Sequence, residues 1–506
     1  MTLLAEVVDV SRGVSATSSR SAKVEALAGL LRRLEPGEVA IAAGLLSGLP
    51  RQGRVGVGYS TVYGLEVAPA TAPSLTVEDL DAAIVRIQGA TGPGSANQRR
   101  EIVADLLGRA TEAEAEFVRR LFTGELRQGA LAGLMIDAVA KAAEVPADVA
   151  RRALMLSGDL TRTAEIALTE GVDGLRAVGL ELFRPILPML ASTAGDVADA
   201  LGGFGLASVE WKLDGIRIQI HRRGDDVRIY TRNLNDITHA LPGIVEAVLR
   251  LPVEQTVLDG EALWMDEHGP ASFQETVAQI DSDAPPEGIA TFLFDALHVD
   301  GEDLLDLPLR VRAARLAEIA SELRIPSVLT NDAHEAERVL DDALRAGHEG
   351  VVVKDAESPY AAGRRGKSWR KVKPVRTYDL VVLGAEWGHG RRQGRLSNLH
   401  LGARDPNGGF VMVGKCFKGL TDELLEWQTN QLLARETERR GIAVFVRPEL
   451  VVEIALDGVQ ASTRYPGGVA LRFARVKRYR PDKGAEEADT IDELRGLLPL
   501  MRSSAT

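Results

Sequence analysis

The stretch VEWKLDGIR at residues 209–217 decides how the centre of the chain folds. Successive side chains of a β-strand point to opposite faces, so Glu210, Lys212 and Asp214 share one face and Trp211 lies on the other. The Asp-Gly pair is a turn signal, after which apolar alternation resumes. A lysine between two carboxylates, on a wall backed by Trp and aliphatic side chains, is placed to react, because a neutral amine is a strong nucleophile. These residues alone fit a surface ladder of paired charges equally well.

The length and composition of the chain set the frame for this motif. A chain of 506 residues suggests about three domains. No apolar run reaches about 18 residues, so we expect no membrane span. The N-terminus lacks a basic region followed by an apolar stretch, so we expect no signal peptide. A single cysteine, Cys416, excludes an internal disulfide and a zinc ribbon, and fits a reducing cytoplasm.

The net charge of −12 argues against a nucleic-acid partner only if it is evenly distributed. Acidic side chains are concentrated in residues 191–374, whereas basic side chains exceed acidic ones in residues 375–483. Binding to nucleic acid requires a local positive face, and the total charge does not decide it.

Apolar periodicity and punctuation divide the chain into three parts. Residues 1–182 have helical periods and predict an all-α domain, with Thr76 and Thr111 as N-terminal caps. The Pro-punctuated stretch FRPILP at 183–188 marks a join. Residues 183–375 mix short alternating strands with helices at 308–322 and 333–346, which indicates an α+β domain.

The remaining residues, 376–506, predict a small β-barrel of the oligonucleotide-binding type, the OB fold. Strand-like runs occur at 379–386, 410–416, 448–456 and 469–476. Thr421 opens a helix that we expect to continue to about Arg440. We expect the acidic tail after Gly484 to form a loosely held helix.

Five further segments follow the lysine motif in a fixed order. They are YTRN at 230–233, LDGE at 258–261, FLFD at 292–295, EGVVVK at 349–354 and SWRKVK at 368–373. Each alone has an ordinary structural interpretation: Asp-Gly-Glu is usually a turn, Phe294 a core residue, and Lys-x-Lys a solvated strand edge. Six segments in this order are much harder to obtain by accident.

Together these motifs resemble those of the covalent nucleotidyltransferases, which include ATP-dependent DNA ligases, RNA ligases and mRNA capping enzymes. The resemblance is narrower to three-domain ATP-dependent DNA ligases of the bacterial and archaeal type, and it covers nearly the whole chain. Residues 126–142 resemble their helical DNA-binding domain, 184–191 the entry to an ATP-grasp-like nucleotidyltransferase domain, and 447–476 the end of their OB-fold domain. Ala474 departs from the proline that is common there.

The resemblance implies a role for each matched residue. Lys212 attacks the α-phosphorus of ATP and forms lysyl-AMP, with release of pyrophosphate. AMP then passes to the 5′-phosphate at a nick in double-stranded DNA, where the 3′-hydroxyl displaces it. The implied nucleotide contacts are Glu210 to the adenine amino group, Phe294 stacked on the base, Glu261 at the ribose, and Arg217 and Arg232 at the sugar and the nicked-strand phosphate.

The resemblance also implies the residues that handle the phosphates. Lys371 and Lys373 neutralise charge on the α-phosphate, and Arg370 belongs to the same nucleotide-binding stretch. Arg472 orients the departing pyrophosphate. Two carboxylates, Glu349 and Asp214, are the candidates for holding Mg²⁺, which prefers carboxylate oxygens and water. The resemblance implies a cytoplasmic, monomeric enzyme that takes part in DNA replication, repair or recombination; a clamp or repair-protein partner is not readable from the sequence.

Two alternatives remain open at this stage. RNA joining or capping belongs to the same superfamily, but those enzymes typically lack a long helical N-terminal domain. A catalytically idle DNA-binding scaffold would use the helical domain and the barrel, but it would not need every charged motif position.

Overall fold

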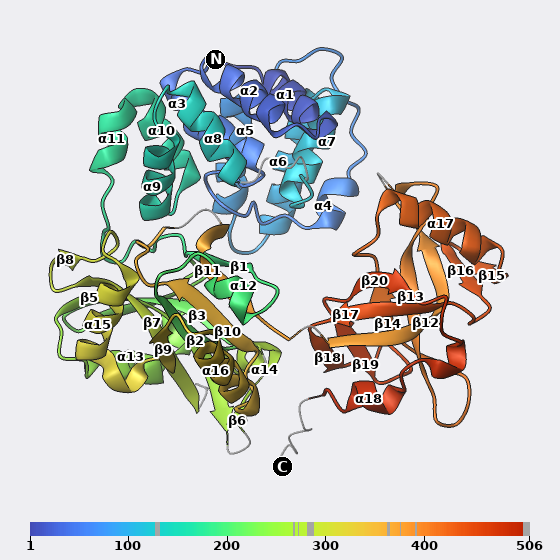
Figure 1. The fold of residues 1–506 in the computed structure, drawn as a ribbon. Helices are drawn as coiled ribbons and strands as arrows, with labels where there is room; N and C mark the ends of the chain where they lie inside the picture. The colour runs from blue at the N-terminus through green and yellow to red at the C-terminus, as the bar shows by residue number, and fades with distance from the viewer. Residues whose placement is uncertain are drawn as a thin grey trace. The chain divides into compact units, whose positions relative to one another are not determined.

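The computed structural model describes residues 1–126, 132–266, 269–271, 273–280, 288–361, 365–374, 376–389 and 392–498 (Figure 1). Residues 127–131, which include part of the segment resembling a ligase DNA-binding domain, lie outside this description. The chain divides into two compact units, Met1–Val372 and Lys373–Thr506. Among the described residues, no helix is long and apolar enough to cross a membrane.

The first unit begins with an all-helical part, as the sequence predicts. Its helices are α1 (Leu4–Ala16), α2 (Arg20–Leu31), α3 (Pro36–Ser47), α4 (Tyr59–Tyr63), α5 (Val77–Gly89), α6 (Ser95–Arg109), α7 (Glu112–Phe122), α8 (Ala132–Ala142), α9 (Ala147–Ser157), α10 (Leu160–Thr169) and α11 (Gly171–Ala177). Thr76 and Thr111 cap α5 and α7 as predicted, each in a complete capping box with the acidic residue three positions later. One apolar core unites these helices.

The rest of the first unit contains two sheets. The first sheet has the order β1-β11-β10-β2-β9. Its strands are β1 (Leu190–Thr193), β2 (Ala207–Lys212), β9 (Ser327–Thr330), β10 (Gly350–Asp355) and β11 (Arg365–Val372). Helices α12 (Val197–Leu201) and α16 (Ala333–Arg345) pack against this sheet through one apolar cluster. Residues that alternate with this cluster along the strands, such as Glu210 and Lys354, lie on the other face of the sheet.

The second sheet has the order β4-β3-β5-β7-β8, with β6 paired to β5. Its strands are β3 (Ile216–Arg223), β4 (Asp226–Thr231), β5 (Gln255–Asp266), β6 (Gly269–Pro270), β7 (Ile289–Val299) and β8 (Glu302–Asp303). The helical segments of this part are η1 (Thr238–Ala240), α13 (Pro242–Leu249), α14 (Phe273–Ile280), α15 (Leu309–Ala320) and η2 (Ser321–Leu323). The helices predicted at 308–322 and 333–346 are α15 and α16, so the α+β prediction is confirmed.

The second unit is a curled antiparallel sheet with one longer helix. Its elements are β12 (Arg376–Trp387), β13 (Leu396–Arg404), β14 (Phe410–Cys416), α17 (Asp422–Leu433), β15 (Glu436–Arg440), β16 (Ala443–Val446), β17 (Val451–Leu456), β18 (Gly458–Ala461), β19 (Val469–Arg472), β20 (Arg475–Tyr479), η4 (Ala485–Glu487) and α18 (Ile491–Arg495). Strand β12 pairs with β17 along its first half and with β16 near its end, which curls the sheet. This architecture agrees with the expected OB-type barrel.

Three details of the second unit differ from the sequence-based expectations. The helix that Thr421 caps ends at Leu433, and residues 436–440 form β15 instead. The run 469–476 splits into two strands because Phe473 adopts a left-handed backbone with φ 53°. The acidic tail is not loosely held, since Ile491 and Leu494 are buried in the core of this unit.

Candidate active site

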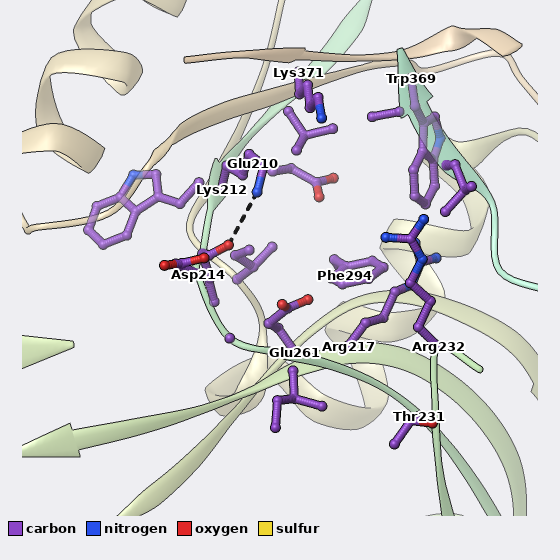
Figure 2. A pocket seen from close by; sticks show the side chains of 18 of the residues that line it. Glu210, Lys212, Asp214, Arg217, Thr231, Arg232, Glu261, Phe294, Trp369 and Lys371 are labelled. Carbon is purple, nitrogen blue, oxygen red and sulfur yellow. Dashed lines mark hydrogen bonds between the residues drawn. The ribbon is translucent and has the colours of Figure 1, made fainter. Parts of the chain in front are cut away.

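A cavity of about 650 Å³ is lined by side chains from both sheets of the first unit (Figure 2). The side chains that matter for its chemistry are Glu210, Lys212, Asp214, Arg217, Arg232, Glu261, Phe294, Lys354, Trp369 and Lys371. Strand β2 ends at Lys212, and the turn that follows leads into β3 of the second sheet. A Cβ atom at Gly215 would lie 2.4 Å from the carbonyl oxygen of Ala262, so this turn requires glycine. The motif of the sequence therefore joins the two sheets at the cavity.

Lys212 lies at the end of β2 and contacts a carboxylate from another strand. Its Nζ donates a hydrogen bond to Glu349, which immediately precedes β10, and lies 3.4 Å from the carbonyl oxygen of Leu213. The backbone N–H of Glu349 donates to the carbonyl of Lys212 at 3.0 Å, so the two residues are also joined through the main chain. Their side chains are 21% and 20% exposed. The amine is thus held by its neighbours and still open to the cavity.

Glu210, the next residue of β2 on the same face, is buried and paired with Lys354 of β10. The Nζ of Lys354 lies 2.5 Å from Oε2 of Glu210, and the two side chains are 2% and 5% exposed. Burial raises the pKa of the Glu210 carboxyl, and the ammonium of Lys354 opposes that rise. The same ammonium lies 4.4 Å from the ring centre of Phe294 and 4.1 Å from that of Trp369.

Lys354 has no role among the sequence-based predictions, although the sequence contains a signal for it. Val351 and Val353 of β10 are buried in the cluster beneath α16, so Val352 and Lys354 must face the cavity, and both line it. The alternation of side chains in EGVVVK therefore predicts that Lys354 faces the cavity, provided that a helix is known to cover the opposite face of the strand.

Glu261 comes from β5 and faces the cavity from the second sheet. Burial raises the pKa of its carboxyl to about 7, while the nearby Lys212 and Arg217 act in the opposite direction. Such a carboxyl changes charge near neutral pH. Its protonated form can donate a hydrogen bond and its ionised form can only accept one.

Arg217 of β3 lines the same cavity and stacks on its aromatic wall. Its guanidinium carbon lies 5.2 Å from the ring centre of Phe294 and 5.7 Å from that of Trp369. Burial disfavours its charge, but the carboxylate of Asp259 outweighs burial and raises the pKa of Arg217. The charge on this arginine is therefore permanent. Arg232, at the exposed turn after β4, is a further basic residue of the lining.

The lysine-rich segment of β11 divides between the two faces of its strand. Trp369 and Lys371 line the cavity. Arg370 is absent from the cavity lining and donates to the carbonyls at the C-terminal end of α12, at 2.9 Å for Asp199, 3.0 Å for Ala200 and 2.7 Å for Gly202. Successive residues of a strand face opposite ways, so the placement of Arg370 does not support the nucleotide contact expected of it.

Two candidate residues belong to the second unit. Lys373 is its first residue, with Nζ 3.8 Å from Oδ2 of Asp457. Arg472 ends β19, where its carbonyl accepts a hydrogen bond from the N–H of Asp457 at 3.1 Å. Its guanidinium lies 6.0 Å from the ring centre of Phe473.

The carboxylates of the site are compatible with Mg²⁺ bound together with a nucleotide. Among the described residues, no group of three or more His, Cys, Asp or Glu side chains is placed to hold a metal ion. Mg²⁺ sites of phosphoryl-transfer enzymes typically use one or two carboxylates, with waters and substrate phosphates completing the octahedron. Glu349, bonded to the amine of Lys212, and Asp214, in the lining, are such carboxylates.

Comparisons with known proteins agree over nearly the whole chain. Residues 188–373 match the family model described as ATP dependent DNA ligase domain, residues 392–483 the ATP dependent DNA ligase C terminal region, and residues 60–140 the DNA ligase N terminus. The chain is 58% identical to a probable DNA ligase of Saccharopolyspora erythraea, over 98% of both chains. It is 54% identical to a probable DNA ligase of Rhodococcus jostii, over 98% of this chain and all of the relative.

A solved structure designated Pmar-Lig_Pre shares the fold. It has a TM-score of 0.64 at 20% identity and covers 94% of this chain and 99% of its own. A second one, Pmar-Lig_PreS3, has a TM-score of 0.62 at 19% identity with the same coverage.

Proposed function

Because the chain belongs to the ATP-dependent DNA ligases, we propose that Lys212 is the residue that carries AMP from ATP to a nick in duplex DNA. The observation that carries this assignment is the placement of Lys212, at the end of β2, in a cavity lined by charged and aromatic side chains. The amine of Lys212 is hydrogen-bonded to the carboxylate of Glu349 and is still accessible to a ligand in the cavity.

The covalent step follows from the chemistry of an amine and a triphosphate. The nitrogen of Lys212 forms a bond to the α-phosphorus as the bond to the pyrophosphate oxygen breaks, which leaves lysyl-AMP. The lysine must lose a proton before it attacks, and the carboxylate of Glu349 is in hydrogen-bond contact with that amine. The 5′-phosphate of the nick then takes the AMP from the lysine, and the 3′-hydroxyl displaces AMP as the phosphodiester bond forms.

We assign the remaining cavity residues by the part of the nucleotide that each can bind. Glu210 accepts the adenine amino group, Phe294 stacks on the base, and Glu261 binds the ribose hydroxyls. Arg217 and Arg232 contact the sugar and the nick phosphate. Support comes from their common presence in the cavity lining, to which strands β2, β3, β5 and β7 of both sheets contribute all of them except Arg232.

Cations neutralise the negative charge on the phosphates. Lys371 of the first unit and Lys373 and Arg472 of the second unit are assigned to the phosphates and the departing pyrophosphate. Mg²⁺, held by Glu349 and Asp214 with the nucleotide, would offset negative charge on the phosphoryl oxygens. Arg370 is left out of this assignment because α12 engages its guanidinium.

We divide the work of the chain among three segments and propose that the enzyme is monomeric and cytoplasmic. Residues 1–182 grip DNA, residues 183–375 form lysyl-AMP, and residues 376–506 serve both nucleotide and DNA. The single, buried Cys416 fits a reducing compartment. Binding to a nick is expected to weaken steeply as salt rises, because phosphate contacts release counterions.

The test is the sealing of a nicked DNA duplex with ATP, NAD and GTP compared side by side. We expect sealed product with ATP and Mg²⁺ and little with NAD. Nicks with a ribose or a deoxyribose at the 3′ end separate DNA joining from RNA joining. Equal or better sealing of ribose nicks would favour RNA joining, and binding without sealing would favour the idle scaffold.

A further inference from the structure

Tyr360 is a buried polar residue that the proposed mechanism does not use. It follows β10, is 2% exposed, and its ring packs edge-on against Trp369 with ring centres 6.0 Å apart. Its hydroxyl donates to Oδ2 of Asp259 at 2.7 Å, and accepts from the N–H of Met189 at 3.0 Å and from Nη2 of Arg217 at 3.3 Å. A hydroxyl has one donor and two acceptor positions, so this geometry uses all of them.

These bonds belong to a network that fixes the guanidinium of Arg217. Nε and Nη2 of Arg217 bind the two oxygens of Asp259 at 2.9 and 2.5 Å, and Nη1 donates to the carbonyl of Met189 at 2.5 Å. Together with the contact to Tyr360, these bonds use four of the five N–H donors of a guanidinium. The orientation of Arg217 in the cavity is thus set by groups behind it.

The same network reaches the segment that joins the helical part to the sheets. Both backbone groups of Met189 are bound, one by Tyr360 and one by Arg217. Gln219, two residues along β3 on the same face, binds both backbone groups of Ile186. Side chains of β3 therefore bind the joining segment at Ile186 and at Met189. The contact at Met189 is made by Arg217 itself.

We propose that Tyr360 is a positioning residue of the nick-sealing reaction, which acts by locking Asp259 and Met189 around Arg217. The inference rests on the proposed role of Arg217 at the sugar and nick phosphate. Asp259 is 1% exposed, so it depends on its donors for compensation of its charge. Without the Tyr360 hydroxyl, Asp259 loses a donor and the N–H of Met189 loses its acceptor. The guanidinium is then free to leave the orientation in which it meets its ligand.

The test is a double-mutant cycle with Tyr360→Phe and Arg217→Ala, read out as the single-turnover sealing rate of a nicked duplex. Tyr360→Phe keeps the ring packing and removes only the hydroxyl. We expect it to slow sealing about tenfold, the scale of a lost hydrogen bond to a charged group. In the Arg217→Ala background we expect it to change the rate less than about twofold, since the residue through which it acts is gone.

The matched control is Tyr230→Phe. Its hydroxyl also binds the joining segment, at the carbonyl of Phe183 with 2.8 Å, but it has no bond to Arg217 among the described contacts. We expect this variant to seal at a rate within about twofold of wild type. That result would show that loss of a tyrosine hydroxyl near the joining segment does not by itself slow sealing. Thermal unfolding of every variant shows that the folded chain is being compared.

Four outcomes decide the matter. Equal losses from Tyr360→Phe in the wild-type and Arg217→Ala backgrounds would overturn the inference alone, as would wild-type sealing by Tyr360→Phe. Normal sealing by Arg217→Ala would overturn the proposed role of Arg217 and the inference with it. If Tyr360→Phe does not fold, the isosteric Asp259→Asn takes its place in the same cycle, and additivity with Arg217→Ala would again overturn the inference.

Discussion

At the scale of single residues, the partner of Lys212 is a carboxylate that lies far away in the sequence. The motif suggested a lysine held between Glu210 and Asp214, and the face assignment places all three at the cavity. The bonded carboxylate is instead Glu349, and Glu210 turns to Lys354. Side chains two apart along one strand are about 7 Å apart, whereas cross-strand neighbours are about 5 Å apart. Spacing in the sequence therefore predicts the face of the strand but not the ion pair.

The assignment of Lys212 makes a direct prediction. Incubation with ATP and Mg²⁺, followed by peptide mass mapping, should find AMP on Lys212. Lys212→Ala should abolish both this adduct and sealing with ATP, because the other lysines of the lining have different roles: Lys354 is paired with Glu210, and Lys371 is assigned to the phosphates. Lys367→Ala, at an exposed position of β11, is the control and should seal normally. An adduct at another residue, or sealing by Lys212→Ala, would contradict the mechanism.

Glu261 predicts a pH dependence of stability. Its pKa is raised by burial from an ordinary value of 4.5 to about 7. Between these values the unfolded chain has released its proton and the folded chain has kept it, so this carboxyl destabilises the fold progressively as pH rises from about 4.5 to about 7. Glu261→Gln removes that cost. The melting temperature of Glu261→Gln relative to that of wild type should therefore be higher at pH 8 than at pH 5, by an amount equivalent to about 1–3 kcal/mol.

The control for this comparison is Glu246→Gln, at an exposed position of α13, which also removes one carboxylate. Thermal scans of the ligand-free proteins at the two pH values give the measurement. An equal difference between Glu261→Gln and wild type at pH 5 and pH 8 would show that burial at this position does not shift the pKa of the carboxyl.

At the scale of elements, capping and periodicity in the sequence predicted where helices begin better than where they end. Thr421 begins α17 as predicted, but the helix ends at Leu433. Residues 436–440, ETERR, carry no helix-breaking residue; they pair with β16 as an outer strand, a tertiary contact that no local signal announces. The strand-like runs expected at 379–386, 410–416 and 448–456 are β12, β14 and β17, whereas β13, LSNLHLGAR, was not expected although Leu399, Leu401 and Ala403 alternate with other residues along it.

The capping box of α7 predicts a measurable contribution to stability. The Thr111 hydroxyl lies 2.8 Å from a carboxylate oxygen of Glu114, which is completely buried, and accepts from the Glu114 N–H at 3.4 Å. Thr111→Ala should lower the free energy of unfolding by about 1–2 kcal/mol. Urea denaturation gives the value, with Thr71→Ala in an exposed loop as the control. Equal stability of the two variants would mean that the cap contributes nothing.

At the scale of the whole molecule, the candidate residues are distributed over two compact units with separate cores. The boundary falls between Val372 and Lys373, inside the lysine-rich segment. The sequence places Lys371 and Lys373 on one face of a continuous strand, but β11 ends at Val372, and Lys373 begins the second unit near Asp457. Periodicity cannot reveal such a boundary, because the chain stays extended across it. The cavity belongs to the first unit, whereas the predicted site residues Lys373 and Arg472 belong to the second.

The contribution of the second unit is tested through Arg472. The resemblance to the family implies that this arginine orients the departing pyrophosphate, which is present only in the first step. Arg472→Ala should therefore slow formation of lysyl-AMP by about a hundredfold, the scale of one lost transition-state contact to a phosphate. It should seal a pre-adenylated nick at nearly the wild-type rate. Arg478→Ala on β20, whose guanidinium pairs with Glu453 at 2.7 Å, is the control for loss of a basic residue from this unit. Equal loss in both steps, or loss in sealing alone, would mean that Arg472 binds DNA phosphate and does not serve ATP.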